Sequence, residues 1–306
     1  VKDFSDRISV MRRGKNVGTV ITNETEISEI ISMMVGRQLS NDVKKEQAVH
    51  AGEELLALKK ISLTKSHKKV LDEISLTVHR GEILGIAGID GSGQDELTDV
   101  IDGMIHPQAG EIIFCGEDIR HLNPMKRRKK GMGFIPQDRH KYGLVLNFTV
   151  EENLILGIQR NPTFTHRGMI DFKARKEHAK KYIQEFDIRT PDENAKASGL
   201  SGGNQQKIII AREMSMNPSL VIANQPTRGV DIGAIEFIHT TLVRARNNGC
   251  GVLLVSLELD ELLDICDRIA VMYSGRVMGI LSAKDATREK IGMMMVGKEL
   301  ADASVT

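Results

Sequence analysis

ILGIAGIDGSGQDEL, at residues 83–97, places a strand signal, a glycine-rich turn and a helix signal in direct succession. Residues 83–87 form a short continuous apolar run, which is typical of a buried parallel strand. The apolar residues after the turn fall at i, i+3, i+4 and i+7 on one helix face: Leu97, Val100, Ile101 and Met104. Glycines in such a turn expose backbone N–H groups, and the helix N-terminus favours an anion. The stretch therefore predicts a phosphate-binding loop at 88–95, although its shape alone fits a plain strand–turn–helix connection equally well.

Two more apolar runs, LVIA at 220–223 and GVLLV at 251–255, are each followed by a turn and a helical pattern. Strands that alternate with helices indicate an α/β fold with a parallel sheet. Residues 150–196 are charged and mainly helical in pattern, so we expect a helical subdomain at about 145–215. Three other segments show a different alternation of apolar and polar residues and predict a smaller antiparallel portion of the fold: residues 55–63, 74–79 and 110–114.

The composition excludes several classes of protein. The chain has 42 Lys and Arg residues against 41 Asp and Glu residues, so it is not built mainly to coat nucleic acid or an anionic membrane surface. Aromatic residues make up 4% and Trp is absent, which argues against a protein that stacks single-stranded bases. The three cysteines are far apart, so we expect neither a disulfide framework nor a zinc site. No apolar run is long enough for a membrane-spanning helix, and the first residue, Val1, suggests a piece of a longer protein.

The chain repeats part of its ending near its start. Residues 6–18 read DRISVMRRGKNVG and residues 267–279 read DRIAVMYSGRVMG, which places the two strings 261 positions apart. MMVGRQL at 33–39 matches MMVGKEL at 294–300 at the same separation. Two matches at one spacing predict an internal repeat. The alternative is a coincidence between two strand–turn–strand endings.

The repeat sets the expected domain boundaries. Residues 1–39 are predicted to be the tail of a preceding domain, and residues 55–300 a complete second copy. Residues 40–54, SNDVKKEQAVHAGEE, are polar and predict an exposed linker. Residues 301–306 form a short tail.

Three further motifs follow the predicted loop. FIPQDRHKYGL lies at 134–144, LSGGNQQK at 200–207 begins a helical pattern, and VIANQPTRGVD at 221–231 continues a predicted strand. With the phosphate loop, they resemble the Q-loop, the signature motif, and the Walker B strand with the D-loop of the ATP-binding cassette family. The resemblance covers residues 55–300 and, through the repeat, 1–39. It implies an α/β fold with a RecA-like parallel sheet core, an antiparallel β subdomain and an α-helical signature subdomain.

Within that family, the motifs are most similar to the C-terminal half of tandem ATPases that drive the import of nucleosides or simple sugars. The resemblance implies ATP and Mg²⁺ as cofactors, with each ATP held between the phosphate loop of one cassette and the signature of the other. The implied partners are the N-terminal cassette of the same chain, membrane permease subunits reached through the groove near Gln137, and, through the permease, an extracellular substrate-binding protein. The implied location is peripheral, on the cytoplasmic face of a bacterial cell membrane. No nucleic acid is expected, because the basic run KRRKK at 126–130 is interpreted as a solvated helix face.

The resemblance assigns residues to two nucleotide sites. To the chain's own nucleotide it assigns His67 near the adenine and a loop made of Gly88, Asp90, Gly91, Ser92, Gly93, Gln94, Asp95 and Glu96. To the partner's nucleotide it assigns the signature and the D-loop acid: Ser201, Gly202, Gly203 and Asp231. Gln137 is assigned to catalysis and is a candidate Mg²⁺ ligand. An exposed loop histidine with no ligand is an equally good interpretation of His67.

Five positions depart from the family pattern: Gln94, Asp95, Asn224, Gln225 and Leu257. Gln94 and Gln225 stand in place of the phosphate-binding lysine and the catalytic glutamate, and an amide supplies neither a charge nor a base at neutral pH. Asn224 stands in place of the Walker B aspartate, and Leu257 in place of the switch histidine. Asp95 replaces the hydroxyl that holds Mg²⁺, and its charge about 4 Å from a phosphate oxygen costs roughly 4 kcal/mol at an effective dielectric of about 20. Alternatively, Asp95 ligates Mg²⁺ with Gln137 and Asn224.

The departures and the intact signature together predict an asymmetric protein. The chain's own site is expected to bind and hydrolyse ATP poorly, whereas Ser201, Gly202 and Gly203 complete the site of the partner cassette. The alternative function is a catalytically inert cassette that serves as a regulatory or structural interaction module. Co-purification with a permease would discriminate between the two.

Overall fold

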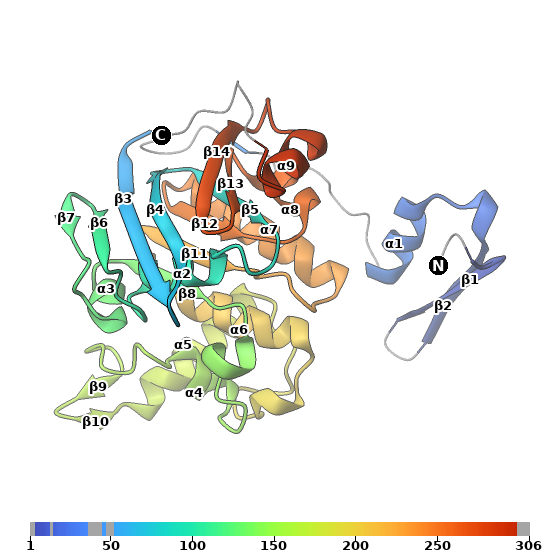
Figure 1. Ribbon diagram of the computed structural model, residues 1–306. Helices are drawn as coiled ribbons and strands as arrows, with labels where there is room; N and C mark the ends of the chain where they lie inside the picture. The colour runs from blue at the N-terminus through green and yellow to red at the C-terminus, as the bar shows by residue number, and fades with distance from the viewer. Residues whose placement is uncertain (1–3, 13–14, 36–44, 47–51, 299–306) are drawn as a thin grey trace.

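The computed structural model (Figure 1) describes four parts of the chain: residues 4–12, 15–35, 45–46 and 52–298. Most of the predicted linker at 40–54 and the predicted tail at 301–306 lie outside the described residues. The described residues form a short N-terminal unit and a larger α/β unit, and each unit is considered by itself.

The larger unit is built around a six-stranded sheet. Its order is β14 (Arg276–Ser282), β13 (Arg268–Tyr273), β5 (Ile83–Gly88), β12 (Gly251–Val255), β11 (Leu220–Asn224) and β8 (Met132–Ile135). The five strands from β13 to β8 are parallel, and β14 is antiparallel to β13. Every residue of β5, β11 and β12 is buried. This confirms the parallel strands predicted from the apolar runs, because both faces of the sheet are covered.

A four-stranded antiparallel sheet packs against one face of the first sheet (Figure 1). Its order is β4 (Lys68–His79), β3 (Glu54–Lys65), β6 (Ala109–Phe114) and β7 (Glu117–Asp118). The predicted antiparallel portion is therefore confirmed. The core between the two sheets also receives α2 (Gln94–Asp102) through Leu97, Val100 and Ile101.

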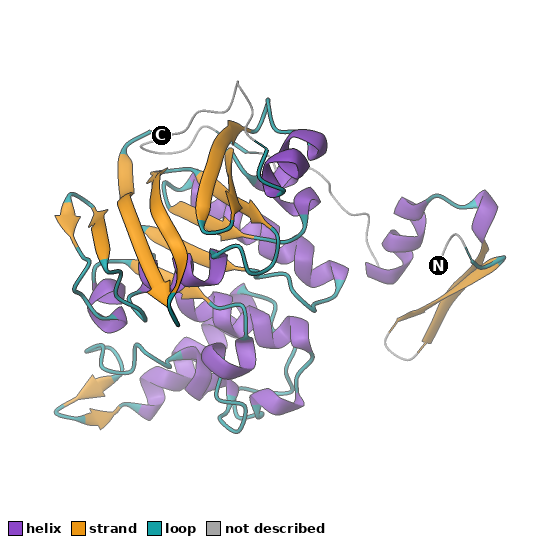
Figure 2. Cartoon of the chain, viewed as in Figure 1, coloured by secondary structure: helices purple, strands orange, loops and turns teal. Residues whose placement is uncertain are grey.

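Helices cover the opposite face of the six-stranded sheet (Figure 2). They are α6 (Gly202–Met214), α7 (Ile232–Asn247), α8 (Leu259–Ile265) and α9 (Arg288–Met295). A second apolar core joins these helices to β5 and β12. The order of antiparallel sheet, parallel sheet and helices gives the α/β architecture that the motifs implied.

The helical subdomain lies below the sheets in Figure 1 and comprises α4 (Val150–Leu154), α5 (Phe172–Glu185) and α6. The prediction of mainly helical structure is wrong for residues 155–171, which form turns and a short hairpin of β9 (Thr165–His166) and β10 (Met169–Ile170). Gly157 and Gly168 adopt positive φ angles there, and Pro162 cannot donate a helical hydrogen bond. Three residues unsuited to a helix thus interrupt the pattern.

The N-terminal unit has the same local structure as the end of the larger unit. It contains β1 (Arg7–Arg12), β2 (Lys15–Ile21), a 3₁₀ turn (Thr22–Glu24) and α1 (Ile27–Val35). A shift of 261 positions places the bounds of β1 and β2 on those of β13 and β14, and the start of α1 on the start of α9. The paired residues also coincide after this shift, including the bulge after Val10, which corresponds to the bulge after Val271. The repeat therefore extends from residue identity to strand register.

Two sequence expectations about α2 and its surroundings are wrong. Met104 does not extend the buried face of α2, because the helix ends at Asp102 with Gly103 in the left-handed conformation, and Met104 is 54% exposed. Arg127, on α3 (Pro124–Lys129), is fully buried and does not belong to a solvated face. Its guanidinium donates to the carbonyls of Val100, Ile101 and Leu122. Two of these are end carbonyls of α2 that the helix itself leaves without a donor, which explains why a cation is stable there.

Asp102, the last residue of α2, gives a pH-dependent prediction. Burial raises the pKa of its carboxyl to about 6, against the opposing effect of the Arg128 charge. A pKa that is raised in the folded state means that the ionised carboxylate destabilises the fold. This destabilisation is absent below about pH 4, and it is complete above about pH 6. We expect Asp102→Asn to raise the free energy of unfolding by about 1–2 kcal/mol near pH 8 and by almost nothing near pH 4. Urea unfolding at both pH values measures this.

The control for Asp102→Asn is Asp264→Asn, at an exposed position of α8. It should change the free energy of unfolding little at either pH. An equal gain at both pH values for Asp102→Asn would contradict the prediction, because the gain would then not come from removing a charge.

Candidate functional site

The predicted phosphate loop connects the end of β5 to the start of α2. Gly93 is the N-cap of α2 at φ +103°, and a Cβ there would lie 2.7 Å from the Val70 carbonyl oxygen. Only glycine suits this position, since both the backbone angle and the space exclude a side chain. Ser92 is buried and donates its N–H to the Ile89 carbonyl, whereas Asp90 and Gly91 are exposed. The strand, turn and helix therefore have the predicted arrangement.

The Gln94 side chain lies inside the loop and is hydrogen-bonded to its backbone. It is buried, and its Nε2 donates to the Ile89 carbonyl at 3.1 Å. It lies so close to Gly88 that a Cβ there would be 2.4 Å from Nε2. An uncharged amide thus occupies the interior of the loop.

Asp95 accepts hydrogen bonds from two amides, that of Asn224 in the Walker B position and that of Gln137 in the Q-loop. Asn224 Nδ2 donates to Asp95 Oδ1 at 2.9 Å and lies 3.2 Å from Thr98 Oγ1. The Gln137 amide is oriented by its neighbours, and the orientation that satisfies them places its nitrogen 3.2 Å from Asp95 Oδ2. Both carboxylate oxygens of Asp95 are therefore paired with amide donors.

The same network continues from Gln137 to the segment after β11. The Gln137 oxygen accepts from Gln225 Nε2 at 2.7 Å and from Arg228 Nη1 at 2.9 Å. Gln225 is buried at φ +47° and its N–H donates to the Val255 carbonyl. The structure thus joins Asp95, Gln137 and the neighbouring pair Asn224 and Gln225, which the sequence places on three separate segments.

These residues do not fit Mg²⁺ in the arrangement described. A hard cation needs several oxygen ligands, but both Asn224 and Gln137 direct nitrogen toward Asp95. The Asn224 Oδ1 atom is buried and has no partner among the described residues. Turning both amides over, so that their oxygens face Asp95, would break all five hydrogen bonds that these two side chains make.

Three other predicted residues of this site take no part in the amide network. Glu96 forms an ion pair with Lys65 at 3.1 Å, which holds its carboxylate at the end of β3. Leu257 is 40% exposed and offers no polar atom. His67 is exposed in the turn between β3 and β4, at φ +64°. This agrees with a plain loop histidine as well as with a stacking residue.

The signature residues form a second group at the N-terminus of α6. Ser201 is the N-cap and accepts from the Asn204 side chain at 2.9 Å. A Cβ on Gly203 would lie 3.1 Å from Asp231 Oδ2, so the D-loop acid is directly beside the signature. Asp231 in turn caps α7 through the Ala234 N–H at 2.9 Å. The structure therefore brings Ser201, Gly202, Gly203 and Asp231 together, and two helix N-termini direct their N–H groups to this region.

Sequence reasoning missed three residues, two of which connect the two groups. Thr98 and Arg228 belong to the amide network, and Arg139 donates through Nη1 to the Arg228 carbonyl at 2.9 Å. Arg139 stands two residues after Gln137 in the quoted Q-loop string, but the resemblance gave it no role. Its place beside Gly202 depends on the π-helical turn at Arg139–Gly143.

A groove of about 1140 Å³ begins at this site. Asp95, Asn224 and Gln137 line it beside α2, and Ile158 and Met216 line it on the side of the helical subdomain. The groove thus separates the sheet core from the helical subdomain next to the Q-loop.

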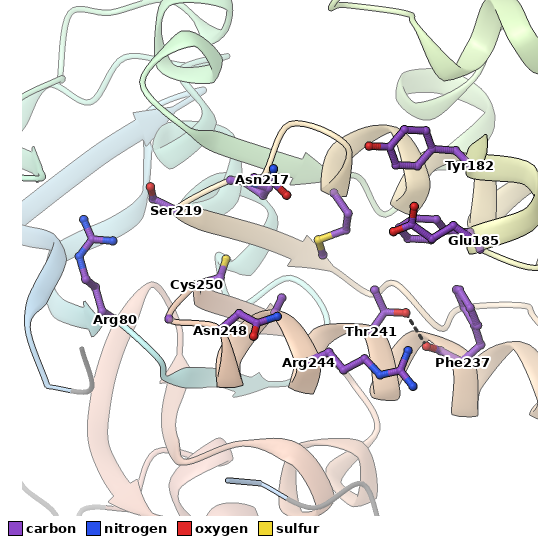
Figure 3. Close-up of a pocket in the computed structure, with 15 residues that line it drawn as sticks. Arg80, Tyr182, Glu185, Asn217, Ser219, Phe237, Thr241, Arg244, Asn248 and Cys250 are labelled. Carbon is purple, nitrogen blue, oxygen red and sulfur yellow. Dashed lines mark hydrogen bonds between the residues drawn. The ribbon is translucent and has the colours of Figure 1, made fainter. Parts of the chain in front are cut away.

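A second cavity of about 570 Å³ lies between α5 and α7 (Figure 3). Tyr182, Phe237 and Arg244 line it, and none of the predicted site residues does. Cys250 also lines it, but burial raises the pKa of the thiol to about 12, so it carries no thiolate at neutral pH. Within the described ranges, no cluster of His, Cys, Asp and Glu is placed to hold a metal ion. The described helices include none that is long and apolar enough to cross a membrane.

Comparisons with known proteins agree with this geometry. The sequence model of the family described as "ABC transporter" matches residues 71–228. The chain is 43% identical over 300 residues to the guanosine import ATP-binding protein NupO of Bacillus subtilis, covering 97% of this chain and 58% of that protein. It is 41% identical over 309 residues to the glucose import ATP-binding protein TsgD13 of Haloferax volcanii, covering 100% of this chain and 56% of that protein. The chain thus spans less than two thirds of the length of these curated relatives.

A solved structure shows the same fold. The crystal structure of a nucleotide-free ATP-binding cassette from an ABC transporter superposes with a TM-score of 0.66 at 25% identity. The superposition covers 80% of this chain and 100% of the cassette.

Proposed function

Because this chain belongs to the ABC transporter family, we propose that it is the C-terminal half of the ATP-binding subunit of an importer for nucleosides or simple sugars. The names of two relatives, one a guanosine and one a glucose import protein, support this substrate range. The LSGGNQQK string at 200–207 supports it independently.

The C-terminal position rests on the repeat. Residues 1–39 are proposed to be the end of a first cassette, residues 40–54 a linker, and residues 55–300 the second cassette. The 261-residue shift that superposes the bounds and register of two hairpins supports this, as does the 58% coverage of the first relative. The first cassette would then be the partner that closes on this one.

The observation that carries the mechanism is the closed amide network around Asp95. A working site needs a lysine charge, a metal ligand and a base, and here Gln94, Asn224 and Gln225 occupy those positions. The Gln94 amide is bonded to the Ile89 carbonyl, and the Asn224 and Gln225 amides are bonded to Asp95 and to Gln137. The signature, by contrast, presents free N–H groups at a helix N-terminus. We therefore propose that this half completes the ATP site of the first cassette, where ATP is bound with Mg²⁺, and that its own site binds nucleotide weakly or not at all.

The groove beside Gln137 is the proposed attachment point for the permease. It separates the two parts of the cassette that nucleotide binding would move relative to each other, so a permease segment seated there would sense that movement. The protein would then act as a peripheral subunit on the cytoplasmic face of a bacterial membrane, with an extracellular substrate-binding protein beyond the permease. A non-transport interaction module is the second candidate, which the five departures favour. Co-purification of the full-length protein without any permease would favour this second candidate.

The 306-residue chain alone is expected to hydrolyse no ATP in a phosphate-release assay. The base is missing at Gln225 and the cation at Gln94, and a general base alone contributes about 10²–10⁴-fold. Gly202→Asp and Gln225→Ala serve as controls, because trace release that neither variant changes comes from a contaminant. Release that Gln225→Ala abolishes would overturn the proposal of an inactive site.

A further inference from the structure

The guanidinium of Arg139 lies directly against the signature. A Cβ built on Gly202 would be 2.9 Å from Arg139 Nη2 and 3.4 Å from its Cζ. Nη1 is anchored on the Arg228 carbonyl at 2.9 Å, and Gly229 of the same D-loop is the other close neighbour. The side chain therefore bridges the Q-loop, the D-loop and the N-terminus of α6.

The charge of Arg139 is not compensated within the described part of the chain. No carboxylate there lies within ion-pair distance of its guanidinium, and its Nε atom is buried without a hydrogen-bond partner. Asp231, the acid beside the signature, directs one oxygen to the Ala234 N–H and the other toward Gly203. The N-terminus of α6 adds a further positive potential at the same place. A cation that has unpaired donors and lies beside a helix N-terminus is unfavourable, because two positive potentials meet there. An anion in the space that the cation and the helix N-terminus both face removes this cost.

We propose that Arg139 contacts the γ-phosphate of the ATP bound by the opposing cassette, alongside Ser201 and the N–H groups of the signature. This inference rests on the proposed function, in which the signature of this half closes the partner's site. In phosphoryl transfer the developing charge spreads over the equatorial oxygens of the transferred group. Nη1 is bonded to the Arg228 carbonyl and Nε is buried, so Nη2 is the nitrogen of Arg139 that can donate to such oxygens. The guanidinium remains protonated throughout, so Arg139 transfers no proton. The oxygen of a water molecule bonds to the γ-phosphorus while the bond to the bridging oxygen breaks, and the electron pair of that bond leaves with ADP. The proton of the water passes to the phosphate product, and Arg139 stabilises the negative charge on the equatorial oxygens of the transferred group.

The test uses the full-length protein with its permease and compares Arg139→Ala, Arg139→Lys and Ser201→Ala. We expect Arg139→Ala to lower kcat about 10²–10³-fold with little change in KM, since the lost donor acts mainly in the transition state. Trapping of ADP with orthovanadate should weaken in parallel. Arg139→Lys should recover part of kcat because it keeps the charge but loses the planar fork. Guanidinium ion at a non-denaturing concentration should partly restore turnover to Arg139→Ala.

Arg244→Gln is the matched control, because it removes an exposed guanidinium on α7 that lines the other cavity (Figure 3). It should leave kcat, KM and vanadate trapping unchanged. If Ser201→Ala abolishes turnover while Arg139→Ala does not, the role of Arg139 is refuted and the proposed function stands. If neither variant lowers turnover, the proposed function itself fails. Loss of turnover in Arg139→Ala without guanidinium rescue, together with a lowered unfolding temperature, would show a structural role and refute the inference.

Discussion

Replacing Ser201 by Ala in the full-length protein is expected to lower ATP turnover and transport about 10²–10³-fold, the usual cost of one donor aimed at developing charge. Ser201 stands exposed at the start of α6, on the surface that would face the partner's phosphate loop, with the N–H groups of Gly202 and Gly203 behind it. Gly202→Asp should be at least as damaging, because its carboxylate would repel the phosphate and its Cβ, 2.9 Å from Arg139 Nη2, would displace the guanidinium. Alanine at Gln94 or Gln225 should change turnover far less, since neither amide supplies a charge or a base whose removal would lower the rate.

Ser198→Ala is the matched control for the signature variant. Ser198 lies in the 3₁₀ turn (Ala197–Gly199) just before the signature and is exposed. A loss of turnover in Gln225→Ala with full activity in Ser201→Ala would place the working site on this half. That pattern would reverse the proposed asymmetry.

The sequence predicted the strands of the parallel sheet well because their signal is local. β5, β11 and β12 are continuous apolar runs, and burial on both faces leaves no other arrangement for them. The ends of elements were harder to predict. Met104 fitted the apolar period of α2, but one glycine at 103 ended the helix before it. The short hairpin at 165–170 has too few residues to produce a period.

In the candidate site, too, the features within one motif could be predicted, whereas contacts between distant segments could not. The five departures were visible in the sequence because each stands in a motif with a fixed pattern. That the amides bond to Asp95 and to one another depends on side chains from β11, α2 and the Q-loop meeting in space, which no spacing predicts. Arg127 is a further example of a position that the local sequence does not predict. A basic run predicts a solvated face on average, but one arginine in it is buried because the end of α2 offers it carbonyl groups.

Combining Gln94→Lys with Asp95→Thr in the 306-residue chain is expected to tighten MgATP binding about 10²–10³-fold. The charge of Asp95 near a phosphate costs roughly 4 kcal/mol at an effective dielectric of about 20, and 1.4 kcal/mol corresponds to a factor of ten in affinity. The substitution also removes the acceptor that holds the Asn224 and Gln137 amides, which frees both side chains to face a metal ion. Calorimetry with MgATP measures the change, starting from a wild-type chain that we expect to bind more weakly than low micromolar.

The control must separate the rebuilt loop from a simple gain of positive charge. Gln184→Lys with Asp264→Thr changes the net charge by the same amount at exposed positions on α5 and α8. It should leave MgATP affinity unchanged, because charges separated by more than about 10 Å are largely screened at ordinary salt. If the control tightens binding as much as the loop variant, the effect is long-range attraction and not repair of the site. If the wild-type chain already binds MgATP at low micromolar concentration, the amide network is no barrier to nucleotide, and the mechanism by which Asp95 opposes binding is wrong.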